Sequence, residues 1–358
     1  MINTANIKPP IRIGMVSFAH YHANFWSEVF RDSPETNLVG IWDSNKARGQ
    51  NAANTYETEY VADLEELLSQ VDAIGLCNET SFHADVIEKA AAHGVHVLCE
   101  KPLATSNLEC DRIIDAVQNS GIVFQQSFPK RFDAVNHEIK RLIDSEALGR
   151  ITLMRVRHCH FYGLDPEFSK EWHTDATLSG GGALIDEGIH GADLIRWFLG
   201  EPLSVMAMLS EDAAQLGVDD LGLAVFRFEG GALAELVSSS TIQAADSSVE
   251  VFGTKGSAIL SGVDLASKDF SPEKSLKVYT DELRRGSWTI PDIVTQFKKG
   301  EFHQQNALSF VRTLIEGTPP PVTLEDGCRS LAMILAAYEA ANTGQVVAIS
   351  GTTQSKNS

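Results

Sequence analysis

The chain has 358 residues, 43% hydrophobic and 22% charged, a composition typical of a globular protein with enough length for two cores. Its 29 Lys and Arg against 48 Asp and Glu give a net charge of −19, and so acidic a surface repels nucleic acids and anionic membranes. There is no signal-peptide pattern, no apolar run of the ~18 residues that a membrane span needs, and no C-x-x-C pair among five scattered cysteines, so we expect a cytoplasmic protein with buried thiols.

Strands and helices alternate through the first third of the chain. Valine, isoleucine and leucine dominate the predicted strands, which cover residues 11–16, 37–43, 71–77, 95–102 and 121–126. Helical periodicity follows the first strand and recurs from residue 46 and over 63–70, 81–94 and 108–118. This alternation predicts a parallel sheet covered by helices on both faces.

Beyond about Gly149 the pattern changes to runs of adjacent strands. The predicted elements are a long strand at 151–162, two strands within 221–240, a hairpin at 247–262, and two late helices at 303–316 and 324–341, before a tail at 351–358 that we expect to be disordered. We therefore predict an α/β chain, with a dinucleotide-binding Rossmann domain at 1–130 and an α+β domain with an open, mainly antiparallel sheet at 131–358. The second domain is expected to bind substrate and to oligomerise.

The segment from Ile11 to Trp26 has the layout of a dinucleotide-binding turn without its glycines. Where G-x-G-x-x-G is usual, this chain has Ser17, Ala19 and then His22 or Ala23. Small residues at the first two positions still let the backbone approach a pyrophosphate, and the N-terminus of the next helix attracts anions whatever its side chains. We interpret the turn as a variant nucleotide-binding fingerprint.

Asp43 ends the second predicted strand about 20 residues beyond this turn, where a carboxylate accepts hydrogen bonds from the adenosine ribose. The alternative is an aspartate that only caps a loop. His20 and His22 form an H-x-H pair, but metal binding needs further ligands nearby, and the sequence predicts no metal site.

Glu100-Lys101-Pro102 follows directly on an apolar strand, at the sheet edge where such folds bind ligands. Because a residue before proline avoids helical angles, Lys101 is held extended there. Its ammonium can hydrogen-bond a substrate hydroxyl and stabilise alkoxide charge. The alternative is an exposed lysine in a turn.

The sequence SGGGALIDEGIHGADLIRWFLG, from residue 179, joins three glycines to the start of a helix. The glycines allow the backbone to pass close to a neighbouring group. Asp186 and His190 are four residues apart and so share a helix face, with Asp193 three residues further along. A carboxylate beside an imidazole orients the ring as a general base requires, although a buried Asp–His pair that only satisfies itself has the same spacing.

Together these motifs resemble the Gfo/Idh/MocA oxidoreductases, which include glucose–fructose oxidoreductase and inositol dehydrogenase. The resemblance rests on the N-terminal turn, "EKP" after a strand, "KRF" at Lys130–Phe132 and "GGG…D-x-G-x-H-x-x-D", and it extends from about Ile11 to Ile349. It implies a Rossmann domain followed by an open-sheet domain, NAD or NADP as cofactor, and oxidation or reduction of a sugar or polyol carbon. Two departures are the missing glycines and Glu79, which replaces the proline of the family's T-P-N loop.

The resemblance also implies roles for individual residues. The catalytic residues are Lys101, Asp186 and His190, with His190 as the general base. The implied cofactor-binding residues are Ser17, Phe18, Ala19, His20, Asp43, Asn78, Thr80, His83, Glu100, Lys101 and Arg131. The predicted substrate-binding residues are Lys101, Trp172, His173, Asp186 and His190. We expect NAD to be preferred, because Asp43 repels the 2′-phosphate of NADP, although Lys46 and Arg48 are close enough in sequence to soften that preference.

The leading hypothesis is thus an NAD(P)-dependent dehydrogenase of a sugar, sugar derivative or polyol. The alternatives are an NAD-dependent glycosidase and a non-catalytic dinucleotide-binding regulator, although a regulator has no need of an acid–base set. An open sheet with an uncovered apolar face predicts a homodimer or homotetramer. His158, His160 and Tyr162 share a strand face that lines the pocket or lies in a subunit interface, and no third zinc ligand follows at typical spacing.

Overall fold

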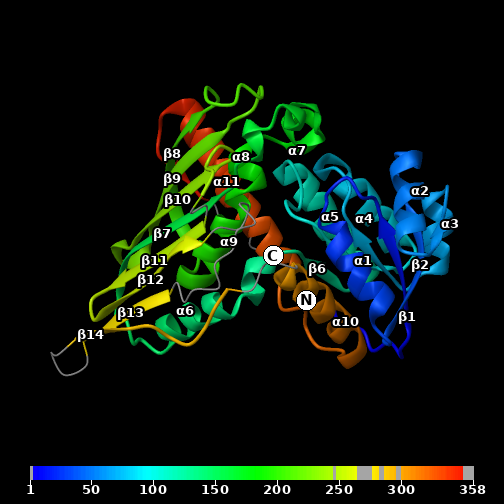
Figure 1. The fold of residues 1–358 in the computed structure, drawn as a ribbon, viewed down its shortest axis with the longest axis horizontal. Helices are drawn as coiled ribbons and strands as arrows, with labels where there is room; N and C mark the ends of the chain where they lie inside the picture. Colours follow the sequence, from blue (N-terminus) through cyan, green and yellow to red (C-terminus); the bar gives the residue numbers. More distant parts are fainter. Residues whose placement is uncertain (1–2, 245–246, 264–275, 282–285, 296–299, 350–358) are drawn as a thin grey trace, which may run out of the picture. The chain divides into compact units, whose positions relative to one another are not determined.

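The computed structural model describes residues 3–244, 247–263, 276–281, 286–295 and 300–349 (Figure 1). By its internal contacts the chain divides into two compact units, Met1–Pro129 with Gly300–Cys328, and Lys130–Lys299 with Arg329–Ser358. The chain therefore returns to the first unit after it has built most of the second. The tail at 351–358, predicted to be disordered, lies outside the described residues.

The first unit is built on a parallel six-stranded sheet, in the strand order β3-β2-β1-β4-β5-β6. Its strands are β1 (Ile11–Val16), β2 (Thr36–Trp42), β3 (Glu59–Tyr60), β4 (Ala73–Leu76), β5 (His96–Cys99) and β6 (Phe124–Gln126). This is the strand order of a Rossmann fold, in which the direction of winding reverses between β1 and β4 and ligands bind at the carboxyl ends of the strands. The predicted fold class is confirmed for this unit.

Helices pack around these strands, and three of them begin at polar caps that the sequence supplies. The helices are α1 (Ala23–Asp32), α2 (Lys46–Thr55), α3 (Leu64–Gln70), the 3₁₀ turn η1 (Thr80–Phe82), α4 (His83–Ala92), α5 (Asn107–Ser120) and α10 (Glu301–Glu316). Asn45, Asp63 and Ser106 each accept a backbone N–H at the start of a helix. Trp26 of α1 and Phe310 of α10 are fully buried in one core, and the two helices lie side by side (Figure 1).

The second unit holds a nine-stranded sheet, in the order β14-β13-β12-β11-β7-β10-β9-β8-β15. Its strands are β7 (Ile151–Cys159), β8 (Pro202–Ser210), β9 (Leu221–Phe228), β10 (Leu233–Ser239), β11 (Ser247–Gly253), β12 (Gly256–Val263), β13 (Leu276–Thr280), β14 (Ser287–Thr289) and β15 (Val347–Ala348). Only the β7–β10 pair is parallel among the described pairings, which confirms the mainly antiparallel sheet.

Helices cover one face of this sheet. The helices of this unit are α6 (Ala134–Asp144), α7 (Ala176–Ser179), α8 (Ala183–Asp186), α9 (Gly188–Leu199) and α11 (Leu324–Thr343), which begins in the first unit, and among them α8 packs on β9 and β10. α9 packs directly on β7 and β10. A Cβ atom at Gly191 would lie 2.3 Å from a methyl carbon of Leu236, so the close approach of helix and sheet requires glycine there.

The other face of the sheet exposes apolar side chains. In β9 the even-numbered positions are buried and the odd-numbered ones are exposed, among them Leu223 and Val225 at 39% each. Leu221 of the same strand is also exposed, and the nearby strands add Leu153, Met206, Met208 and Leu233.

All five cysteines are free and buried, as expected. Among the described helices, none combines the length and the apolar character needed to cross a bilayer.

Candidate functional site

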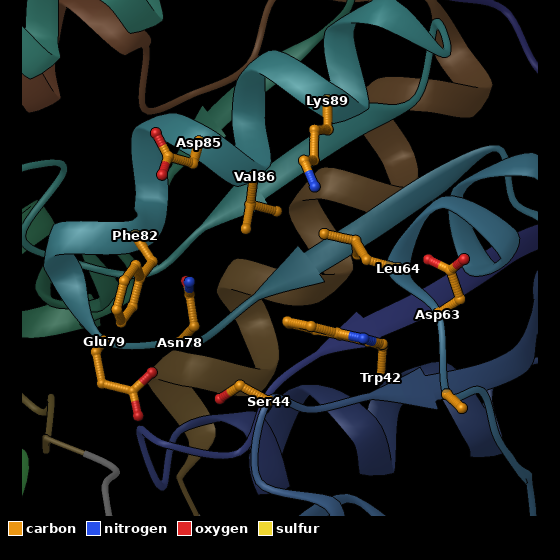
Figure 2. Close-up of a pocket in the computed structure, with 11 residues that line it drawn as sticks. Trp42, Ser44, Asp63, Leu64, Asn78, Glu79, Phe82, Asp85, Val86 and Lys89 are labelled. Carbon is orange, nitrogen blue, oxygen red and sulfur yellow. The ribbon is translucent and has the colours of Figure 1, made fainter.

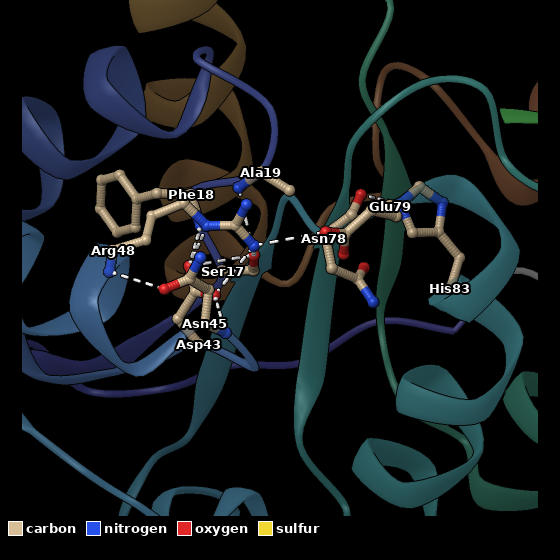
Figure 3. Close-up of polar contacts among 9 residues, drawn as sticks. All are labelled: Ser17, Phe18, Ala19, Asp43, Asn45, Arg48, Asn78, Glu79 and His83. Carbon is tan, nitrogen blue, oxygen red and sulfur yellow. Dashed lines mark hydrogen bonds and ion pairs between the residues drawn. The ribbon is translucent and has the colours of Figure 1, made fainter. Parts of the chain in front are cut away.

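The turn between β1 and α1 adopts with serine a conformation that glycine usually supplies. Ser17 has a φ angle of 68°, in the left-handed region, which costs an L-residue about 1–2 kcal/mol. Its hydroxyl accepts a hydrogen bond from the backbone N–H of Ala19 at 3.1 Å and donates one to Asp43 at 3.2 Å (Figure 3). Side-chain hydrogen bonds therefore hold the turn in place of the missing glycine.

Asp43 is the centre of this network and is 2% exposed. Its Oδ2 accepts from the backbone N–H of Phe18 at 2.8 Å and from Nε of Arg48 at 2.8 Å, in addition to the Ser17 hydroxyl. Its Oδ1 accepts from the backbone N–H of Asn45 at 2.8 Å and from Nη2 of Arg48 at 2.9 Å (Figure 3). Burial lowers the pKa of Arg48, but the hydrogen bonds and charges of Asp43 and Glu79 together outweigh it and raise that pKa overall. Asp43 thus holds the surrounding loops in place, as the alternative interpretation of a structural aspartate requires. Its binding of the adenosine ribose stays a prediction.

A pocket of about 500 Å³ opens beside these residues, past the ends of β2 and β4 (Figure 2). Phe82 and Trp42 lie on either side of Asn78 in this pocket. The other lining residues are Ser44, Ala62, Asp63, Leu64, Glu79, Asp85, Val86 and Lys89. Oδ1 of Asn78 is buried and has no hydrogen-bond partner among the described residues. Aromatic walls around a spare amide acceptor suit a flat heteroaromatic ring that carries N–H donors.

His83, predicted to bind the cofactor, braces two loops of the first unit. Its Nδ1 lies 3.1 Å from the carbonyl oxygen of Leu103, and its Nε2 lies 3.2 Å from that of Asn78. Burial lowers the pKa of His83. Thr80 begins the 3₁₀ turn just before it and is buried. His83 therefore shapes the loop that carries Asn78 and Thr80.

Glu100 and Lys101 lie directly after β5 and are both buried, at 1% and 2% exposure. The interpretation of Lys101 as an exposed lysine in a turn is therefore wrong. Nδ1 of His22 lies 3.1 Å from Oε1 of Glu100, and His20 packs against His22 with ring centroids 4.2 Å apart. Glu100 thus forms a buried cluster with His20 and His22, although it lies 78 residues beyond His22 in the chain.

In the second unit, the glycine run lies close to Asp219, two residues before the start of β9. A Cβ atom at Gly182 would lie 2.0 Å from the carbonyl oxygen of Asp219. The Asp219 carboxylate accepts the backbone N–H groups of Gly182 and Leu184 at 2.8 and 2.7 Å, and the Tyr338 hydroxyl at 2.7 Å. The neighbouring group that the glycines were expected to admit is thus this aspartate, which fixes the start of α8.

The helix expected to carry Asp186 and His190 is divided in two. α8 ends at Asp186 and α9 begins at Gly188, with Glu187 between them. Asp193 lies further along α9 and pairs with Arg131, whose Nη2 is 2.6 Å from Oδ1 of Asp193. Both partners are buried. Arg131, predicted to bind the cofactor, is therefore held by an acid of its own unit.

Glu187 is the residue of this site that the sequence analysis missed. Its Oε2 lies 2.9 Å from Nδ1 of His158 and 3.2 Å from Nε2 of His160. Its Oε1 accepts a hydrogen bond from the Tyr162 hydroxyl, which also donates to Asp186 at 3.1 Å. β7 ends at Cys159, earlier than predicted, yet the three residues of the predicted strand face still converge on one carboxylate.

Trp172 and His173 lie on a 3₁₀ turn, η5 (Trp172–Thr174), and are partly buried. Their rings stack with centroids 3.9 Å apart, and the ring of Phe168 stacks with that of His173 at a centroid distance of 5.8 Å. Both predicted substrate residues thus belong to a small aromatic stack in the same unit as Asp186 and His190.

Comparison with known proteins agrees with this geometry. Residues 11–128 match the family model described as "Oxidoreductase family, NAD-binding Rossmann fold", and residues 136–259 match that of the GFO/IDH/MocA C-terminal domain. The chain belongs to the Gfo/Idh/MocA oxidoreductase family. It is an oxidoreductase with an NAD-binding Rossmann domain.

Relatives of known name span most of the chain. The 1,5-anhydro-D-fructose reductase of Ensifer adhaerens is 29% identical over 323 residues, which are 87% of this chain and 91% of the relative. The scyllo-inositol 2-dehydrogenase (NAD(+)) of Bacillus subtilis is 27% identical over 348 residues, 94% of each chain. A solved structure of levoglucosan dehydrogenase in complex with NADH superposes with a TM-score of 0.82 at 21% identity, covering 95% of this chain and 99% of that one, which shows a shared fold.

Proposed function

We propose that this oxidoreductase is an NAD-dependent dehydrogenase of a sugar, sugar derivative or polyol, with His190 as its general base. The observation that carries the proposal is the burial of His190 among carboxylate and imidazole groups on the Asp-x-Gly-x-His segment of a family member. The names of the relatives, a sugar reductase and an inositol dehydrogenase among them, support the substrate class. We propose residues 1–130 as the dinucleotide-binding domain and 131–358 as the substrate-binding and oligomerisation domain.

The first unit has the features that a dinucleotide needs. Ser17 holds the turn before α1 in its left-handed conformation, and the pocket at Trp42 and Asn78 suits the adenine ring. Asp43 and Arg48 stand at the end of β2, where the adenosine ribose binds in this fold. A bound NAD⁺ would supply the hydride acceptor, with these residues of the first unit holding it.

The residues of the chain supply the proton chemistry. His190 takes the proton of the substrate hydroxyl, a task for which an imidazole titrating near neutral pH is suited. Lys101 donates a hydrogen bond to the same oxygen, and its positive charge stabilises the developing alkoxide. Asp186 orients the substrate and His190. Burial of Lys101 and His190, at 2% and 5% exposure, strengthens these interactions because little water screens them.

The proposal is tested with NAD⁺ and NADP⁺ against a panel of free sugars and polyols, with absorbance of the reduced cofactor as the readout. We expect reduction of NAD⁺ by at least one member of the panel. In a parallel assay with glycosides, release of sugar without net reduction of the cofactor would indicate a glycosidase instead. Cofactor binding without turnover in either assay would indicate a regulator.

The role of His190 is tested with His190→Asn, which keeps a polar side chain of similar size but cannot take the proton. We expect kcat to fall by at least ~10²-fold while the affinity for NAD stays at the parent value. The rise of kcat/KM with pH through a group near ~6.5 should disappear in this variant. His137→Asn changes an exposed histidine of the same unit and serves as the control. A near-normal rate in His190→Asn would disprove the assignment of the base.

A further inference from the structure

Glu187 is a buried carboxylate that gathers the polar side chains around it. It is 4% exposed, and a charge so deeply buried is costly unless it is paired and hydrogen-bonded. His158, His160 and Tyr162 supply its contacts from β7 and the segment after it, as described above. A hydrophobic side chain would fill this space without needing polar partners. The presence of a carboxylate therefore calls for an explanation, which we look for in the residues it contacts.

His158 connects this carboxylate to His190. Its Nδ1 faces Oε2 of Glu187 at 2.9 Å, and its ring packs against the ring of His190 with centroids 4.5 Å apart and an interplanar angle of 34°. Burial lowers the pKa of His158 to about 4, more than the contact with Glu187 raises it, and the charge of Lys130 and the neighbouring His160 lower it as well. At neutral pH His158 is therefore an uncharged ring that contacts both Glu187 and His190.

The same carboxylate lies close to His190 itself. One ring nitrogen each of His158 and His190 and one carboxylate oxygen of Glu187 all lie within 4.8 Å of one another, and all three residues are buried. At such a separation a negative charge stabilises an imidazolium. The charged and titratable groups around this triplet are Lys130, His160, Tyr162 and Asp186.

We propose that Glu187 is a positioning residue for the reaction, which fixes the ring of His190 through His158 and stabilises the positive charge that His190 gains when it takes the substrate proton. The inference rests on the proposed role of His190 as general base. It also assigns the three residues of the predicted strand face, since His158, His160 and Tyr162 hold Glu187 in place and lie inside the second unit.

The test replaces Glu187 by Gln, which keeps the shape of the side chain and removes its charge. We expect kcat to fall about tenfold or more while KM and the affinity for NAD stay unchanged, because Glu187 acts on the base and leaves substrate binding intact. The acid limb of the kcat/KM profile should move to lower pH, since the imidazolium of His190 loses a stabilising charge.

A second measurement does not depend on the substrate. In protein labelled with ¹⁵N-histidine, the ring resonance that is missing from His190→Asn identifies His190, and its titration should move to lower pH in Glu187→Gln. Glu201→Gln removes an exposed acid just beyond the same helix, and both readouts should stay at the parent values. His158→Gln breaks the link but keeps the charge, so kcat should fall while the titration moves less than in Glu187→Gln.

Three outcomes would overturn the proposal. In the first, Glu187→Gln changes neither the acid limb of the kcat/KM profile nor the titration of the His190 resonance, while His190→Asn still abolishes that limb. This result would reject the inference and leave the proposed base intact. The second is a near-normal rate in His190→Asn, which would reject both. The third is a stoichiometric metal ion in the purified protein that is lost in Glu187→Gln, since Glu187 would then be a metal ligand.

Discussion

We predict that the preference for NAD over NADP depends on the ion pair of Asp43 and Arg48. A carboxylate has about four lone-pair sites, and Asp43 already receives hydrogen bonds from three backbone or hydroxyl donors and two guanidinium N–H groups. Replacing Arg48 by Met removes the two guanidinium bonds and the positive charge. It leaves Asp43 with an uncompensated charge and with acceptor sites open to a ribose diol.

The expected magnitude follows from the exposure of this ion pair. A hydrogen bond to a charged group is worth about 1.5–3 kcal/mol, and the Arg48 side chain is 28% exposed, so we take the lower end, about 1.5 kcal/mol. That corresponds to about a tenfold change in a dissociation constant. NADP should therefore lose about tenfold in affinity or more, because its 2′-phosphate meets the bare carboxylate of Asp43. The affinity for NAD should stay level or increase.

The assay is calorimetric titration of NAD and NADP into both proteins at the same salt concentration, with the ratio of the two dissociation constants as the result. The parent is expected to prefer NAD. The matched control is Arg31→Met, which breaks an exposed bidentate pair with Asp32 on α1 and should leave the ratio unchanged. Circular dichroism confirms that the Arg48 variant is folded, since it also loses a partly buried ion pair.

An unchanged ratio in a folded Arg48→Met protein would refute the reasoning. It would show that the 2′-position of the cofactor does not meet this pair. A variant that gained affinity for NADP would contradict the sign of the effect, because the bare carboxylate would then attract the phosphate.

Two further predictions concern the turn and the sheet. Ala19→Leu should weaken NAD binding by about tenfold or more in the same titration, because a bulky side chain blocks the backbone from the pyrophosphate, and normal binding would show that the fingerprint is misplaced. Leu223→Asp, on the exposed face of β9, should shift the predicted homodimer or homotetramer towards monomer in light scattering after size exclusion, while Leu108→Asp on α5 should not. A strictly monomeric parent at micromolar concentration would contradict the second prediction.

The sequence predicted the first unit well because its signals are local. Its central strands β4 and β5 are buried on both faces and so appear as continuous apolar runs, and α2, α3 and α5 begin at polar caps. β8 was missed for the opposite reason. Its exposed positions include Met206 and Met208, so the alternation of polar and apolar residues that marks a half-buried strand is absent.

The site was predictable only where spacing along the chain decides contacts. The four-residue spacing places Asp186 and His190 close together in the chain, although the helix is divided at Glu187, whereas the partners of Glu187 come from 25 to 29 residues earlier on another element. Asp219, which caps α8, is likewise 37 residues from Gly182. Such contacts depend on how the sheet and helices pack, and one sequence carries no signal for them.

The buried carboxylates of this acidic chain fall into two kinds by the number of donors they receive. Asp43 and Asp219 are satisfied by backbone and side-chain donors, several of them from distant parts of the chain, so their first task is to hold the backbone around them in place. Oε2 of Glu100 is buried and has no hydrogen-bond partner among the described residues, and the same holds for Oδ1 of Asn78 and Oγ1 of Thr80. These three residues follow β4 and β5, at the carboxyl edge of the parallel sheet. Because a buried polar atom is costly to leave unpaired, this edge is where the first unit keeps hydrogen-bonding capacity for a ligand, as expected of a cofactor site.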